Sequence, residues 1–134
     1  MQKHRRKYRV PRICRYCGGR VILTTSGAIY GKGEDNIYLC TNCNAYVGCH
    51  QGTRRPLGKL ANTVLRLKRQ ETHTVFDSFW REQGWTRTEA YAWLAKAMRL
   101  DADDAHIACF EMDECEQAME FCRNYKQIEK KEAA

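Results

Sequence analysis

The chain has 134 residues, of which 43% are hydrophobic and 29% are charged, as is typical of one globular domain or two small units. It has no run of 18 apolar residues and no apolar stretch behind its basic N-terminus, so we expect neither a membrane span nor a secretory signal. The net charge of +7 is uneven: residues 1–70 hold 15 Lys and Arg against 2 Asp and Glu, whereas residues 71–134 hold 8 against 14.

The first twelve residues, MQKHRRKYRVPR, carry six basic side chains and no acidic one. They offer little apolar surface, so packing does not offset the entropy lost on ordering them. We therefore expect residues 1–12 to be a basic, flexible arm that becomes ordered on a polyanion. The alternative is an arm that is solvated by charge alone or that docks on the acidic half of this chain.

Residues 13–52 predict short strands and turns. Residues typical of strands gather at positions 21–25, 28–30, 37–39 and 45–47. A glycine-rich turn at residues 31–36 suits a hairpin between the second and third of these segments. So few residues cannot bury a sizeable core, and this part of the chain needs a staple.

Two motifs, Cys14-x-x-Cys17-Gly18 and Cys40-x-x-Cys43-Asn44, are separated by 22 residues and supply that staple. Two cysteines three apart on a tight turn can direct both sulfurs at one ion, and the following residue often takes a positive φ. Glycine adopts that conformation freely and asparagine tolerates it. Two facing knuckles form a tetrahedral cage of four sulfurs, which suits Zn²⁺. We predict a zinc ribbon with one structural Zn²⁺, because four protein ligands leave no open position for a substrate.

Other uses of the cysteines are weaker hypotheses. Iron in a rubredoxin-like site is the main inorganic rival, and a redox C-x-x-C fits less well because two motifs occur without a βαβ pattern. We expect Cys49 and His50 to pack beside the cage, or His50 to contact the zinc-binding cysteines without binding the ion itself. The remaining cysteines fit a small apolar core better than a second metal site with His106: these are Cys109, Cys115 and Cys122.

Residues 53–134 predict a unit of three to four helices that packs with the ribbon, which makes the fold class α+β. Apolar residues spaced as on one helix face begin at residue 57, are interrupted at residues 68–72 and resume until Gly84. Thr86 and Glu89 have the spacing of a capping box that opens the next helix. A last helix carries Met112, Cys115, Met119 and Cys122 on one face. We expect a core shared by ribbon and helices, formed by Phe76, Trp80, Trp93, Leu94 and Phe110.

Basic residues of the N-terminal half are candidates for binding nucleic acid. The candidates are Lys3, Arg5, Arg6, Lys7, Arg9, Arg12, Arg15, Arg20, Arg54 and Arg55. Further cations follow at Lys59, Arg66, Lys68 and Arg69, where a solvated helix face is an equal alternative. Five tyrosines occur in the same half, and flat rings among cations are typical of single-strand binding. The five are Tyr8, Tyr16, Tyr30, Tyr38 and Tyr46, and we expect at least three of them to pack the ribbon.

From residue 13 to about residue 122 the sequence resembles a zinc-finger-containing domain family of unknown function, seen mainly in phage, prophage and bacterial genomes. The matching words are Cys14-x-x-Cys17-Gly18-Gly19, Cys40-x-x-Cys43-x-Ala45-Tyr46-Val47-Gly48-Cys49-His50, Gly52-Thr53, Pro56-Leu57-Gly58, His73, Phe76-Asp77, Trp80, Ala90-Tyr91-x-Trp93-Leu94-Ala95, His106-Ile107 and Phe110. The resemblance implies zinc bound by Cys14, Cys17, Cys40 and Cys43, and it implies no known activity.

We therefore expect a cytoplasmic, non-enzymatic zinc protein, of phage or prophage type, that binds nucleic acid and more readily single strands. The alternative is a protein-interaction module that binds and modulates a host or phage enzyme. The sequence contains no Gly-rich phosphate loop and no H-E-x-x-H motif. His73 and Asp77, four apart on a predicted helix, could act as a catalytic pair, but we expect them to cap or pack.

Overall fold

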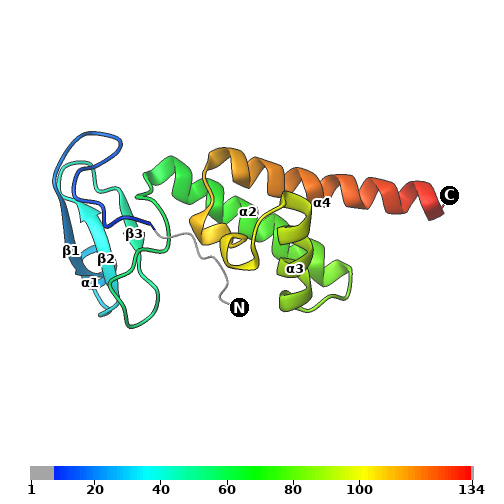
Figure 1. Ribbon diagram of the computed structural model, residues 1–134, viewed down its shortest axis with the longest axis horizontal. Helices are drawn as coiled ribbons and strands as arrows, with labels where there is room; N and C mark the ends of the chain where they lie inside the picture. Colours follow the sequence, from blue (N-terminus) through cyan, green and yellow to red (C-terminus); the bar gives the residue numbers. More distant parts are fainter. Residues whose placement is uncertain (1–7, 134) are drawn as a thin grey trace. The chain divides into compact units, whose positions relative to one another are not determined.

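The computed structural model describes the backbone of residues 8–133 and the side chains of residues 8–125. These residues divide into two compact units, of which the first ends at Arg66 and the second begins at Leu67. A three-stranded antiparallel sheet organises the first unit, and the elements of the second unit are helical (Figure 1). The predicted α+β class is confirmed. Within residues 8–133, no helix has both the length and the apolar character needed to span a bilayer.

The sheet contains β1 (Val21–Thr25), β2 (Asn36–Cys40) and β3 (Tyr46–Gly48), in that order. The first residue of β1 pairs with the last residue of β2, Val21 with Cys40, so β1 and β2 form a ladder along their full length. The strands predicted at residues 21–25 and 37–39 are confirmed, and the last strand begins one residue later than predicted.

The strand predicted at residues 28–30 is wrong, because Gly27–Tyr30 forms one helical turn, α1. Ser26 O accepts a hydrogen bond from Tyr30 N at 2.9 Å, and the turn ends at Gly31, whose φ is 74°. So short a segment between two glycines satisfies its N–H groups locally more easily than by pairing with a distant strand. The hairpin therefore joins β1 directly to β2, with α1 in its loop.

The helical pattern predicted from residue 57 onward is also wrong at its start, because α2 spans Thr63–Glu82. Ala61 exchanges both backbone hydrogen bonds with Tyr46 at 3.0 Å, which adds an extended residue beside β3. Asn62 Oδ1 then accepts a hydrogen bond of 2.9 Å from the backbone of the first turn of α2 and so caps the helix.

A small apolar core holds the first unit together. Its buried members are Cys14, Val21, Tyr38, Cys40, Ala45, Val47 and Leu60, with Cys49 and Leu57 packed against them. Leu57 and Leu60 precede α2, so their helix-like spacing reflects packing on the sheet. Two of the knuckle cysteines belong to this core, so the core and the metal site are continuous.

The second unit contains α2 from Leu67 onward, α3 (Arg87–Met98) and α4 (Met112–Ala133), with short 3-10 turns between α3 and α4. The predicted capping box opens α3: Glu89 N donates to Thr86 Oγ1 at 3.1 Å, and Thr86 N donates to Glu89 Oε1 at 2.9 Å. The largest fully buried side chains of this unit are Phe76, Phe79, Phe110, Leu94, Ile107, Thr72, Cys115 and Cys122.

Of the five predicted core residues, Phe76, Leu94 and Phe110 are buried, whereas Trp80 and Trp93 are half-buried. All five lie in the second unit. The core that we expect them to share with the ribbon therefore stays a prediction. Trp93 packs in a cluster of four rings, with neighbouring centroids 5.0–5.9 Å apart, together with Phe79, Trp85 and Tyr125.

The interruption of the apolar pattern at residues 68–72 does not interrupt α2. Arg69 and Thr72 continue the buried face that leads to Phe76. Arg69 Nε donates to Phe110 O at 2.8 Å, and Thr72 Oγ1 donates to a carbonyl one turn earlier at 2.7 Å. Two hydrogen-bonded polar side chains thus occupy positions where the sequence pattern leads one to expect apolar residues.

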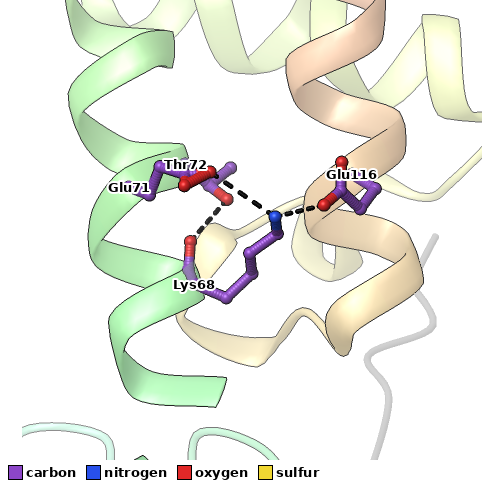
Figure 2. A network of polar contacts seen from close by, with 4 residues as sticks. All are labelled: Lys68, Glu71, Thr72 and Glu116. Atoms are coloured by element: carbon purple, nitrogen blue, oxygen red, sulfur yellow. Dashed lines mark hydrogen bonds and ion pairs between the residues drawn. The ribbon is translucent and has the colours of Figure 1, made fainter. Parts of the chain in front are cut away.

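A polar network lies beside this face and joins α2 to α4 (Figure 2). Lys68 Nζ forms an ion pair with Glu116 of α4 and a second one, at 3.5 Å, with Glu71 Oε1. The Thr72 hydroxyl donates a hydrogen bond to the Lys68 carbonyl and so stabilises this turn of α2. Lys68 is thus engaged in contacts within the second unit.

Candidate metal centre and basic surface

The first knuckle is a tight turn that begins at Cys14. Gly18 N donates to Cys14 O at 3.0 Å, and Cys14 N donates to Gly19 O at 2.8 Å. The backbone N–H groups of Tyr16 and Gly19 point at the sulfurs of Cys14 and Cys17, each at 3.4 Å. Gly18 has a φ of 74°, as predicted. The turn therefore presents both sulfurs together and directs a backbone N–H group at each of them.

The second knuckle repeats this geometry at the end of β2. Asn44 N donates to Cys40 O at 3.1 Å, and Cys40 N donates to Ala45 O at 2.8 Å. The amides of Asn42 and Cys43 both donate to Cys40 Sγ at 3.4 Å. Asn44 has a φ of 66°, which confirms the second prediction of a left-handed residue.

The sheet brings the two knuckles together, because β1 follows the first knuckle and pairs with β2, which leads into the second. Cys14 Sγ lies 3.6 Å from Cys43 Sγ, and Cys17 Sγ lies 3.5 Å from Cys40 Sγ. All four sulfurs lie within 4.8 Å of one another. Zn–S bonds of about 2.3 Å in a tetrahedron place sulfurs about 3.8 Å apart, so the cage fits zinc.

The pKa values of the thiols also indicate that the cage binds a cation. Hydrogen bonds from the Asn42 side chain and the Gly19 amide lower the pKa of Cys17 to about 6. The Ala45 amide lowers the pKa of Cys43, but desolvation and the three neighbouring thiols outweigh it and raise this pKa to about 12. Sulfurs this close cannot all ionise without a positive charge among them, and a divalent metal supplies that charge.

Gly19 is a functional residue of the cage that the sequence interpretation missed. A Cβ at this position would lie 2.8 Å from Asn42 Cβ and 3.2 Å from the sulfurs of both Cys17 and Cys40. Its φ is not in the left-handed range, so space and not conformation requires glycine here. The adjacent Gly18 has open space around it and is needed for its φ.

The fold and the closed cage of four cysteines define a small α+β protein that binds one structural zinc ion. The chain belongs to the family of the zinc-finger-containing domain, whose model matches residues 10–125. The matched range covers both knuckles, α2, α3 and much of α4. No curated protein and no solved structure matches the chain.

The other metal-ligand candidates lie elsewhere. Cys49 packs half-buried against the core of the first unit, and burial raises the pKa of its thiol. His50 is exposed, and its carbonyl accepts the Thr53 hydroxyl at 2.8 Å. Within the described residues, only the knuckle cysteines form a group able to hold a metal, so the remaining cysteines serve as buried small residues: Cys109, Cys115 and Cys122.

The His73 and Asp77 pair is engaged in packing. Asp77 Oδ1 accepts a hydrogen bond from Trp80 Nε1 at 3.0 Å, within the same helix. His73 is half-buried, and desolvation lowers the pKa of its imidazole. That the two residues serve the fold and not catalysis stays a prediction.

Six of the ten candidate nucleic-acid-binding residues are described, and all six are exposed at the surface of the first unit: Arg9, Arg12, Arg15, Arg20, Arg54 and Arg55. The other four lie outside the described residues: Lys3, Arg5, Arg6 and Lys7. Two of the further basic residues, Arg66 and Arg69, make contacts within the fold. Arg69 is buried, and Arg66 stacks 4.1 Å from the ring centroid of Tyr46 while it donates to Ala61 O.

The tyrosines of the first unit differ in exposure. Tyr38 is buried in the core of the first unit, and Tyr8 and Tyr46 are half-buried. Tyr30 is exposed, but its hydroxyl is hydrogen-bonded to that of Tyr46 at 2.7 Å. Tyr16, on the first knuckle, is exposed with the Arg15 guanidinium 5.3 Å from its ring centroid.

Proposed function

We propose that this zinc-finger protein binds nucleic acid, and single strands more readily than duplexes, through the basic surface of its first unit. The observation that carries the proposal is that none of the six described candidate arginines is buried. Residues 8–66 hold nine Lys and Arg and only two acidic residues, Glu34 and Asp35, so their net charge is 9 − 2 = +7. A surface of this sign attracts the phosphates of any nucleic acid.

The role of the zinc follows from the fold. Its ligands shape the knuckles, and the arginines lie on or beside them: Arg12 and Arg15 flank Cys14, and Arg20 follows Gly19. Among residues 8–62, the single turn of α1 is the one helical element, and it is too short to enter a groove. Contacts to the phosphate backbone therefore dominate, with weak sequence preference.

The state of the cysteines also bears on the cellular location of the protein. None of the eight cysteines forms a disulfide. The reducing cytoplasm keeps cysteines in this state, and the knuckles need reduced sulfurs to bind zinc. The resemblance described above supports a phage- or prophage-type accessory role. We therefore infer a location in the cytoplasm of the host cell.

Binding of the full-length, zinc-loaded chain to labelled single strands tests the function. We expect the affinity to fall steeply as salt rises from about 50 to 200 mM. The double variant Arg54→Gln/Arg55→Gln should reduce the salt slope by about one for each lost phosphate contact. Lys96→Gln/Arg123→Gln removes two exposed charges from the second unit and is the matched control.

Affinity that does not change with salt, or equal effects of the two double variants, would reject the proposal. Purification from the native host separates it from the protein-interaction alternative. A partner protein that stays bound after nuclease treatment supports that alternative, whereas co-purified nucleic acid supports the function proposed here.

A further inference from the structure

The segment of residues 10–16, which leads into the first knuckle, carries apolar side chains that belong neither to the zinc cage nor to the core of the unit. Val10, Ile13 and Tyr16 are 49%, 72% and 40% exposed, within a stretch of seven residues. Exposed apolar residues are ordinary when single. Three large ones in so short a segment are typical of a surface that a partner covers.

The same segment is strongly cationic. Arg9, Arg12 and Arg15 alternate with these three residues along the chain, and all three are accessible to solvent. No acidic residue precedes Glu34 in the sequence. The Arg15 guanidinium lies 5.3 Å from the centroid of the Tyr16 ring, so charge and a flat apolar surface occur side by side.

The zinc knuckle holds this ring on a rigid support. Tyr16 N donates to Cys14 Sγ at 3.4 Å, inside the turn closed by Gly18. Ile13 forms a β-bridge with Arg20 on the other side of the same turn. Because the backbone of residues 13–20 is already ordered, stacking a ligand on the Tyr16 ring costs little further conformational entropy.

The matching ligand has negative charges spaced along a chain and flat apolar faces between them. An unpaired stretch of nucleic acid has both features, whereas a duplex hides its base faces by stacking. We propose that Val10, Ile13 and Tyr16 form a base-contact site for single-stranded nucleic acid, in which the Tyr16 ring stacks on a base while Arg9, Arg12 and Arg15 bind neighbouring phosphates. This site rests on the proposed function.

Tyr30 provides a matched control in the same unit. It is 62% exposed, more than Tyr16, but its hydroxyl and ring are engaged by Tyr46. It also precedes the loop that contains Glu34 and Asp35, the two acidic residues of this half. An exposed ring without the cationic surroundings should contribute nothing to binding.

The test compares two probes of equal charge on the full-length, zinc-loaded protein: an oligothymidylate of about 20 nucleotides and an abasic strand of the same length. We expect the wild type to bind the base-bearing strand about 5- to 100-fold more tightly. Tyr16→Leu should abolish that difference without a change in zinc content or salt slope. Tyr16→Phe and Tyr30→Leu should preserve it. A parallel measurement with oligouridylate shows whether the protein binds DNA or RNA more tightly.

The outcomes separate the two proposals. Equal binding of both probes by the wild type overturns the base-contact site and leaves the proposed function standing. Absence of binding to either probe rejects the proposed function itself. If Tyr16→Leu weakens both probes equally, the ring supports the fold and does not contact a base, and the site is rejected.

Discussion

Gly19 lies against the second knuckle, where a side chain has no room. We expect Gly19→Ala to weaken zinc binding by about 10- to 100-fold, the range typical of residues that support metal ligands. A methyl group 3.2 Å from Cys17 Sγ and Cys40 Sγ would force one sulfur away from the ion. Competition with a chromogenic chelator measures the affinity.

The control for this substitution is Gly48→Ala, whose added methyl group would meet only Leu57 Cδ1 at 3.5 Å, an ordinary contact. It should leave the zinc affinity unchanged. Equal affinities of wild type and Gly19→Ala would show that the cage adjusts to the methyl group and that our steric argument is wrong.

Residue-scale prediction from the sequence was sound where the reason is local. The positive φ of Gly18 and Asn44 follows from the C-x2-C turn alone, and both were predictable. The need for glycine at position 19 arises from Asn42 and Cys40, which belong to the other knuckle. No spacing rule within one motif contains that information.

His73 predicts a pH dependence of the second unit. Burial lowers the pKa of its imidazole below the usual 6.5, although the carboxylate of Asp77 partly opposes this. Above pH 6.5 the histidine is neutral in both the folded and the unfolded state. As the pH falls below 6.5 the unfolded chain takes up the proton first, so stability decreases until the folded-state pKa is passed.

Denaturant unfolding followed by tryptophan emission checks this, since all three tryptophans lie in the second unit. His73→Gln should flatten the decrease in stability as the pH falls below about 6.5, whereas His50→Gln, at an exposed position of the first unit, should not. An unaltered pH profile in His73→Gln would contradict the prediction.

At the scale of the helices, Arg69 joins α2 to the segment that precedes α4. We expect Arg69→Ala to destabilise the second unit by about 1–3 kcal/mol, because Phe110 O loses the donor that lies 2.8 Å away. Lys68→Gln, which breaks the partly exposed network of Figure 2, should have a smaller effect. Chemical denaturation of each variant gives the comparison. A larger loss for Lys68→Gln would reverse our ranking of the two contacts.

The helices and strands were predictable to different degrees. The α3 capping box and the long strands carry their signals locally, and the structure agrees. The segment at residues 57–61 has helical spacing, yet its residues pack on the sheet and pair with β3. A pattern of apolar positions predicts which residues are buried, but not which element they pack against. The strand prediction for α1 was wrong for a related reason, because the backbone of this segment forms its hydrogen bonds within its own turn.

At the scale of the whole molecule, each unit has its own buried residues, and zinc belongs to only one of them. Structural zinc contributes on the order of 10 kcal/mol to the folding of a small cage. We expect chelation to unfold the first unit and to leave the second unit folded.

Amide NMR spectra should lose the dispersed signals of residues 8–66, while the tryptophan emission stays unchanged. A red shift of that emission on chelation would support the shared core expected from the sequence. The same titration thus tests whether the two units depend on each other.

The hairpin of β1 and β2 has one further consequence for practical work. Its two ends are opposite in character: Val21 and Cys40 pair at the sulfur-bearing end, and Thr25 and Asn36 pair at the loop. The junction between residues 31 and 32 is exposed at that loop. An epitope or fluorophore-binding peptide spliced there lengthens a surface loop, and each doubling of loop length costs only about 0.6 kcal/mol. This junction therefore suits the labelling of the protein in living cells.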